Sequence, residues 1–427
     1  MHRVVITGVG MSTSLGADLE TCWTRLLNGE RGVAPISLWD PSEYSVKVAA
    51  EVRHVPQESG LAGVPRNWCR RGVRLFLPVA REAFAGAQMD RRPIPSERVG
   101  VAVGASVNYL DMQLMKQYFR FRRPEREVLD VRRFATEGEQ PAYDFHRRQG
   151  EMIASLPAKM LNITGPTFVT DTACASSAHA IGEAYRMVRR GQAQAMLAGG
   201  SAALVSPLCI LGFSLLGALS RNPDAAQASR PFDRRRDGFV MGEGAGAVVL
   251  EQLESAQARG SRIYAEVIGY GSTLSAHNLT DPSPDGCAEA RAISLALAEN
   301  SVAPEQVDYI AAHGTSTPKN DAVETRAIKR VFGGHARRLL VSSNKGQIGH
   351  TIAAAGVCNL ICAVKALTER CAPPTMHLEH PDPECDLDYV ANRKRPAGIQ
   401  LALAHAFAFG GQNAVLALRT WPGDKKQ

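Results

Sequence analysis

The chain has 427 residues, of which 45% are hydrophobic, so it can bury a large core without disulfides or metals. Its nine cysteines are irregularly spaced, and none forms a Cys-x2-Cys pair or a Cys/His cluster with zinc spacing, so we expect no metal. The formal net charge of +7 favours acidic partners. Aromatic residues make up only 6% of the chain and no nucleic-acid-binding motif is present, which argues against nucleic acid as that partner.

The first ten residues are typical of a buried strand followed by a turn. Residues 4–6 are β-branched, and Gly8 and Gly10 follow, whereas a signal peptide needs a long apolar segment after a basic start. We therefore expect a cytoplasmic protein. The chain has no uninterrupted apolar run of about 18 residues, so we also expect no membrane span.

Four arginines gather between residues 66 and 74. Arg66, Arg70 and Arg74 recur every four residues and would share one helix face, with Arg71 beside them. A solvated helix face is the ordinary interpretation of this pattern. An acidic partner would give the same arginines a docking role.

Residues 107–150 interrupt an otherwise regular alternation of short β-branched runs and longer amphipathic segments. Lysines and arginines are mixed there with aromatic side chains. We interpret this segment as an inserted cap over the first half of the chain. It could form a contact surface for an anion or for a dimer partner, or it could be a solvated helical insertion.

Cys174 follows an apolar run, Thr167–Val169, at the point where small residues introduce a helical stretch. The positive end of a helix dipole and its unpaired N–H groups would lower the pKa of a thiol there, and the same amides can hold an oxyanion. A single intracellular cysteine is more often a small buried hydrophobic residue. A reactive Cys174 therefore needs support from elsewhere in the chain.

Three segments of the first half are echoed, in the same order, in the second half. The Cys174 segment, for example, is a strand, a polar turn and a small-residue helix, and that sequence occurs twice. These echoes indicate an α/β protein with two related layered halves, 1–255 and 256–427, whose turns face each other. The echoed pairs are 99–106 with 307–316, 166–174 with 339–355, and the glycine-rich hairpins 238–250 with 406–418.

The second half supplies groups that could serve Cys174. His313 comes directly after a predicted strand, and His350 opens the helix that echoes the cysteine helix. Two imidazoles converging on one thiol would provide a nucleophile, a base and hydrogen-bond donors to a carbonyl. Lys345 precedes His350 in the same turn, where it could pair with Glu324 or lie on the surface.

At these positions the chain resembles the elongating β-ketoacyl-[acyl carrier protein] synthases of the thiolase-like superfamily, over essentially its whole length. Taken together, in this order and at this spacing, the motifs are highly specific. The resemblance implies an α/β thiolase-like fold in which two duplicated halves form a five-layered α-β-α-β-α arrangement. The matching motifs are Asp171–Ser177, Arg230–Gly238, His313–Pro318, Lys345–His350 and Phe407–Gly411.

The resemblance also implies roles for individual residues. Cys174 would accept the acyl group, and His313 and His350 would assist decarboxylation of a malonyl unit. Lys345 and Glu324 would organise the site. The remaining implied roles are an oxyanion hole from the amides of Cys174 and Phe409, a gate at Phe409, pantetheine contacts at Thr315 and Thr317, and carrier-protein docking at Arg66, Arg70, Arg71 and Arg74.

No cofactor is implied, because the substrates are carried on the phosphopantetheine of acyl carrier protein. The implied partners are that carrier protein and a second subunit, either an identical chain or a ketosynthase-like chain-length factor. The insertion and the segments Ile36–Tyr44 and Pro381–Tyr389 also resemble ketosynthases of bacterial type II polyketide systems, which favours a specialised pathway over housekeeping fatty acid synthesis.

The chain departs from the family pattern near the gate. Ala408 replaces a glycine, which restricts the backbone there, and Lys345 is followed by Gly-Gln-Ile where the family usually has Ser-Met-Thr. An alternative function is a non-catalytic chain-length-factor-like subunit or acyl-binding protein, but such subunits usually lack the cysteine. A thiolase or cysteine hydrolase fits less well, because no second cysteine lies between Ala402 and Asn413.

Overall fold

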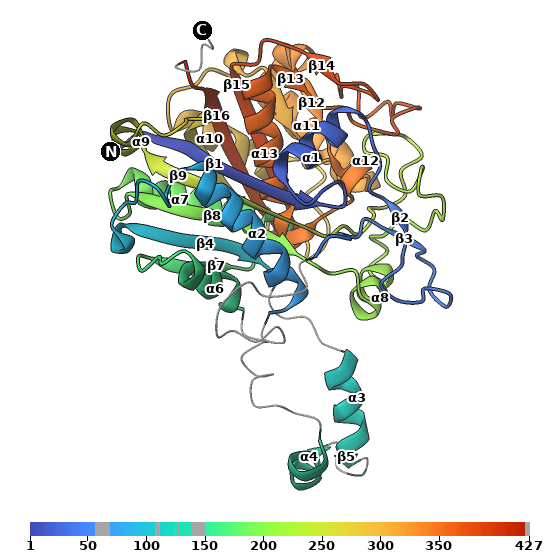
Figure 1. Cartoon of the computed structure of the whole chain (residues 1–427). Coiled ribbons are helices and arrows are strands. Elements are labelled where there is room, and N and C mark those ends of the chain that lie inside the picture. The colour runs from blue at the N-terminus through green and yellow to red at the C-terminus, as the bar shows by residue number, and fades with distance from the viewer. Residues whose placement is uncertain (56–68, 107–111, 124, 126–127, 139–149, 423–427) are drawn as a thin grey trace.

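The computed structural model describes residues 1–427 apart from 56–68, 107–111, 124, 126–127, 139–149 and 423–427. Ten strands form one large mixed sheet between helices (Figure 1). Nearly every residue of the central strands is buried, as expected where helices cover both faces of a sheet. The strands of this sheet are β1 (Val4–Thr13), β4 (Val99–Ala105), β7 (Thr167–Thr170), β8 (Ala195–Ala202), β9 (Gly244–Gln252), β10 (Ala265–Leu274), β11 (Tyr309–Ala311), β12 (Leu340–Ser342), β15 (Leu401–Phe407) and β16 (Gln412–Thr420).

The sheet contains the same five-strand pattern twice. The strand order is β1-β9-β8-β4-β7 in the first half and β10-β16-β15-β11-β12 in the second, so corresponding strands take corresponding places. At the centre, β1 and β10 pair antiparallel, with Val5 opposite Glu266, and join the halves into one continuous sheet. The prediction of an α/β fold with two duplicated halves is confirmed.

Helices form three layers around the two halves of the sheet. The central layer consists of α7 (Ser176–Arg189) and α13 (Ala355–Glu369), which pack on each other and contact strands of both halves. Small side chains allow this close approach: a Cβ added at Gly356 of α13 would lie 2.7 Å from the backbone nitrogen of Ala178 in α7. The outer layers are α2 (Arg71–Gly86) and α6 (Met152–Met160) on the first half and α10 (Cys287–Ala298) and α11 (Pro318–Phe332) on the second. The result is the expected α-β-α-β-α arrangement.

The remaining elements are helices and short two-stranded sheets at the periphery. The helices are α1 (Leu19–Leu27), α2 (Arg71–Gly86), α3 (Met112–Phe121), α4 (Val131–Glu137), α6 (Met152–Met160), α7 (Ser176–Arg189), α8 (Pro207–Leu215), α9 (Leu253–Arg259), α10 (Cys287–Ala298), α11 (Pro318–Phe332), α12 (Lys345–Ile348) and α13 (Ala355–Glu369). The short strand pairs are β2 (Ala34–Pro35) with β3 (Val48–Ala49), β5 (Arg122–Arg123) with β6 (Val128–Leu129), and β13 (Cys371–Ala372) with β14 (Arg395–Pro396).

One predicted echo differs between the halves. Residues 408–411 do connect β15 to β16 as a tight hairpin, but the corresponding strands β8 and β9 are antiparallel neighbours joined by a long connection that contains α8. The segment 238–250 is therefore not a hairpin. The first half uses this longer connection to build the wall beside Cys174.

The described part of the insertion at 107–150 does not form the predicted cap over the first half. Its described helices α3 and α4 project away from the body (Figure 1). Their aromatic side chains pack on each other instead: the rings of Phe121 and Phe134 lie 5.7 Å apart, and Arg133 lies over the ring of Phe121. These aromatic contacts thus lie within the insertion itself.

One stretch of the described residues, 352–369, is long and apolar enough by composition to cross a membrane, with a mean hydropathy of 1.5. It includes α13, and 89% of it is buried inside the fold. Its apolar side chains are therefore accounted for by packing in the central layer. Cys358 and Cys362 lie in this helix and are core residues.

Candidate active site

Cys174 lies in a single 3-10 turn, Ala173–Ala175, between the end of β7 and the start of α7. Ala173 takes a left-handed conformation there, with φ of 49°. The second half contains an equivalent left-handed residue: Ile352 has φ of 42° in the turn Ile352–Ala354 that leads into α13. Such strained turns cost on the order of 1 kcal/mol each and aim a side chain out of the sheet edge.

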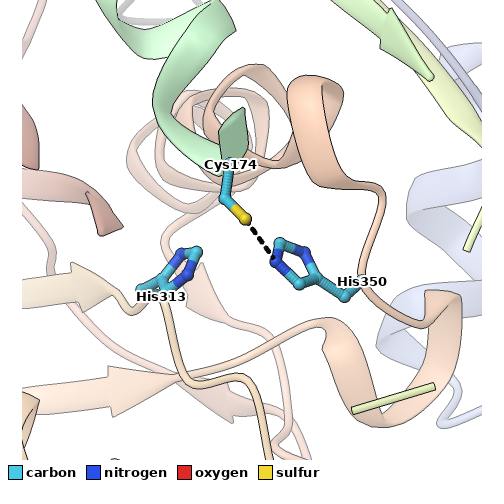
Figure 2. Close-up of side chains that lie close together, drawn as sticks. All are labelled: Cys174, His313 and His350. Carbon is cyan, nitrogen blue, oxygen red and sulfur yellow. Dashed lines mark hydrogen bonds between the residues drawn. The ribbon is translucent and has the colours of Figure 1, made fainter. Parts of the chain in front are cut away.

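The predicted convergence of Cys174, His313 and His350 is present (Figure 2). Cys174 Sγ lies 3.1 Å from His350 Nε2, within hydrogen-bond distance. The two imidazole rings are 5.3 Å apart and nearly perpendicular, and one ligand atom from each of the three residues lies within 4.8 Å of the others. All three side chains are buried, so a reaction at the sulfur would take place away from bulk water.

The prediction that His350 opens a helix is wrong. His350 lies in the extended segment before the 3-10 turn Ile352–Ala354. Its backbone N–H donates to Val240 at 2.7 Å, and its carbonyl accepts from Gly242 at 2.9 Å. The ring of Phe239 meets the imidazole edge-on at 5.0 Å. The segment before β9 therefore fixes both the backbone and the ring of His350.

The pKa of Cys174 differs from the prediction, which was a lowered pKa and a thiolate at a helix N-terminus. Burial raises the pKa of the Cys174 thiol to about 11, although hydrogen bonds from the N–H groups of Phe409 and Cys174 and the charge on Lys345 act in the opposite direction. Burial, and then Lys345, hold the pKa of His313 and of His350 well below 6.5. At neutral pH the resting site therefore holds a thiol beside two neutral imidazoles, and His350 is placed to take the thiol proton.

Glu324 positions His313 through the backbone. Its two carboxylate oxygens accept hydrogen bonds from the N–H groups of His313 and Gly314, at 2.8 and 2.7 Å, and it also contacts His405 Nδ1 at 3.0 Å. Asp321, one turn earlier on α11, holds the N–H of Thr315 in the same way at 2.9 Å. The first turns of α11 thus fix the loop that carries His313.

The predicted ion pair between Lys345 and Glu324 is absent. Lys345 is 1% exposed, and its Nζ has no hydrogen-bond partner among the residues that the structure describes. Glu324 instead accepts hydrogen bonds from the His313 loop and contacts His405. Burial lowers the pKa of Lys345 to about 8, and the more distant charge of Glu324 only partly opposes this shift.

Phe409 lies beside the sulfur, where its N–H acts on Cys174. Its ring stacks on Phe213 at 6.2 Å. Ala408 has φ of −135° and ψ of 156°, an extended conformation that alanine adopts as readily as glycine. The left-handed conformations of this loop are at Gly410 and Gly411 instead, so Ala408 causes no backbone strain beside Phe409.

A cavity of about 250 Å³ connects these groups. Cys174, His313 and His350 line its inner end, and the hydroxyls of Thr315 and Thr317, 2.8 Å from each other, lie along the wall formed by the second half. Both threonines that the sequence predicts as pantetheine contacts therefore line the same cavity as Cys174.

The predicted docking arginines do not act as one group. Arg71 begins α2, and its guanidinium binds the fully buried carboxylate of Glu243 through two hydrogen bonds of 2.7 and 2.6 Å and also reaches the carbonyl of Val52. The docking prediction is therefore wrong for Arg71, because its guanidinium is already paired with a buried carboxylate of the same chain. Arg70 and Arg74 are half-buried at the start of the same helix, and Arg66 lies outside the described residues.

The sequence interpretation missed several residues of the site: Phe239, Asp321, His405 and Glu289. The spacing of Asp321 and Glu324, one turn apart just after the His313 motif, was an available signal for the loop-holding carboxylates. Glu289 lines the same cavity from α10, far from any motif. Only the fold reveals that placement.

Comparison with known proteins agrees with this geometry over the whole chain. Residues 1–256 match the beta-ketoacyl synthase N-terminal domain, and residues 264–379 match the beta-ketoacyl synthase C-terminal domain. The 3-oxoacyl-[acyl-carrier-protein] synthase 2 of Synechocystis is 39% identical over 424 residues, 98% of each chain.

Two solved structures are similar over nearly the full length. One is a chain of AntDE:AntF, a type II polyketide synthase acyl carrier protein in complex with its ketosynthase bound to the hexaketide, with 32% identity, a TM-score of 0.87 and coverage of 98% of this chain and 99% of that one. The other is the ishigamide ketosynthase/chain length factor, with 31% identity, a TM-score of 0.86 and coverage of 98% and 99%. The motifs, the duplicated α/β fold and these matches agree: the chain belongs to the beta-ketoacyl synthase family of acyltransferases.

Proposed function

We propose that the chain is an elongating β-ketoacyl-[acyl carrier protein] synthase that joins a Cys174-bound acyl chain to a malonyl unit by decarboxylative condensation. The observation that carries this proposal is the meeting of one thiol and two neutral imidazoles at the inner end of a cavity. Substrates would arrive on the phosphopantetheine of acyl carrier protein, and the proposed chemistry uses no resident cofactor or metal.

In the first half-reaction, Cys174 accepts the acyl group. The thiol proton passes to His350 Nε2 as the sulfur attacks the thioester carbon, and the N–H groups near the sulfur, from Phe409 and Cys174, would hold the oxyanion. Collapse of the tetrahedral adduct releases the pantetheine thiolate, which takes the proton back from His350. One thioester replaces another, so this step needs an activated nucleophile more than a large driving force.

In the second half-reaction, the malonyl thioester loses carbon dioxide and its electron pair becomes an enolate. A neutral imidazole carries one N–H, so His313 and His350 can each donate a hydrogen bond to the enolate oxygen. The enolate carbon then attacks the acyl carbon and the carbon–sulfur bond to Cys174 breaks. The leaving thiolate carries the negative charge that the malonyl carboxylate brought in, and a proton from solvent restores the Cys174 thiol. The depressed pKa of both histidines supports this role, because it keeps them neutral.

We further propose that the enzyme acts in a specialised type II polyketide pathway, in the cytoplasm, as a homodimer or together with a ketosynthase-like chain-length factor. The ketosynthase complexes among the similar structures support this proposal. The higher identity to 3-oxoacyl-[acyl-carrier-protein] synthase 2 favours fatty acid synthesis instead. The acyl chains that Cys174 accepts would decide between the two pathways.

Intact-mass measurement after incubation with a panel of acyl carrier proteins tests the proposal. The wild type should gain the mass of the acyl group, and Cys174→Ala should gain none. Equal acylation of both proteins would refute Cys174 as the nucleophile. No acylation of the wild type by any chain would favour the non-catalytic subunit, and a preference for short saturated chains would contradict the polyketide assignment.

A further inference from the structure

Glu289 is a buried carboxyl that the proposed mechanism does not use. It lies in the first turn of α10, is 2% exposed and lines the cavity of Cys174. Its Oε2 has no hydrogen-bond partner among the described residues. A buried polar atom left without a partner costs about 1–3 kcal/mol, so a group that binds in the cavity is the natural candidate to satisfy it.

The cavity has an apolar part and a polar part. The apolar side chains of Leu216, Ala218 and Phe239 line it beside Cys174 and suit a hydrocarbon acyl chain, and Asp237 is the charged residue that the first half adds to this lining. Glu289 lies on the side of the second half, the same side as His313 and the two threonines. A saturated acyl chain offers no hydrogen bond to a carboxyl, whereas the extender unit has a polar end.

We propose that Glu289 determines extender specificity by sharing a hydrogen bond with the free carboxylate of a malonyl-type thioester. This inference rests on the proposed function of the site. Hydrogen bonds between a carboxylic acid and a carboxylate are short and strong, and they require one proton between the two groups. Burial, with the charges of Asp285 and Glu324 nearby, raises the pKa of Glu289, which favours the protonated form that such a hydrogen bond needs.

The acyl chain and the extender arrive on the same phosphopantetheine arm, and this fact separates the proposal from its main alternative. If Glu289 contacted an amide of the arm, its removal would impair both half-reactions equally. If it binds the extender carboxylate, its removal impairs only the malonyl half-reaction. Acylation of Cys174 is therefore the internal control.

The test compares Glu289→Ala and Glu289→Gln with the wild type in the intact enzyme. For Glu289→Ala, the KM for malonyl carrier protein should rise at least tenfold with a smaller change in kcat, and the rate of acylation should stay within twofold. Glu289→Gln should remain within threefold of the wild type for both substrates, because an amide N–H still donates to the carboxylate. Glu305→Ala, at an exposed position after α10, is the matched control and should change neither.

Two results would overturn the proposal: equal losses in the acyl and malonyl half-reactions, or an unchanged malonyl KM in Glu289→Ala. A purely structural role would instead lower the unfolding temperature of Glu289→Ala, which we expect to equal or exceed that of the wild type. Failure of the proposed function is distinguishable, because the wild type itself would then neither become acylated nor release carbon dioxide.

Discussion

Replacement of Lys345 by methionine should stabilise the protein at neutral pH while impairing catalysis. The ammonium group is buried with no hydrogen-bond partner in the part of the chain that the structure describes, and burial lowers its pKa from 10.5 to about 8. Below pH 8 Lys345 is therefore charged in the folded protein, although water solvates that charge better in the unfolded chain. This lowers the unfolding free energy by about 3 kcal/mol. Methionine has a similar length and removes that cost, so Lys345→Met should raise the unfolding free energy at pH 7 by up to about 3 kcal/mol.

The sign of the pH dependence follows from the depressed pKa of a base. Between pH 8 and 10.5 the unfolded chain holds a proton that folded Lys345 has lost, so the stability of the wild type rises with pH in this window. The advantage of Lys345→Met should therefore be largest below pH 8 and vanish near pH 10.5. Denaturant unfolding of both proteins at several pH values measures this difference.

Lys365 provides a matched control for that experiment. It is also a buried lysine, on α13, but its Nζ is paired with Glu20 at 2.9 Å and with Glu369. Lys365→Met should therefore lose stability at pH 7, because it removes both ion pairs and leaves Glu369 with only its hydrogen bond from Trp23 Nε1. If Lys345→Met is less stable than the wild type at pH 7, or if its difference does not change between pH 7 and 10, the reasoning about Lys345 is refuted.

Three further variants test other parts of the site. His350→Ala should retain acylation within about tenfold but lose about a hundredfold or more of malonyl decarboxylation, and unchanged carbon dioxide release would remove His350 from that step. Arg71→Ala should lower the unfolding free energy by about 3–5 kcal/mol, because Glu243 stays buried without its partner. If its KM for carrier protein is unchanged while charge reversal at Arg70 raises that KM, the internal role of Arg71 is confirmed. Ala408→Gly should cost about 0.4–1 kcal/mol of stability through the unfolded chain and widen the range of accepted acyl groups, whereas an identical range would show that Ala408 does not limit the gate.

The architecture could be predicted from the sequence because the patterns that indicate it are local and occur in both halves of the chain. The turn before α7 and the turn before α13 occur at equivalent places in two halves, so the echo around Cys174 predicted where its partners lie. His313 followed from the same logic, since it ends a strand that neighbours the second turn. Each inference needed only the order of the elements and the rule that related strands take related places in a sheet.

The predictions that failed depended on burial and on distant partners. The pairing of Arg71 joins residues 172 positions apart, and a pattern of exposed arginines gives no sign of it. The thiol pKa was predicted from the helix terminus alone, whereas burial outweighs that effect. Glu324 lies near Lys345 in the site, but its oxygens accept hydrogen bonds from the N–H groups of the His313 loop instead.

The central claim is that Cys174 carries an acyl group into carbon–carbon bond formation. The most direct measurement supplies the wild type with acyl carrier protein and carboxyl-labelled malonyl carrier protein, and follows both the mass of the carrier-bound product and the released label. A 3-oxoacyl product, longer by two carbons and formed with one labelled carbon dioxide per condensation, is the expected result, and Cys174→Ala should form none. Release of label with only acetyl carrier protein as product, or elongation by Cys174→Ala, would contradict the claim.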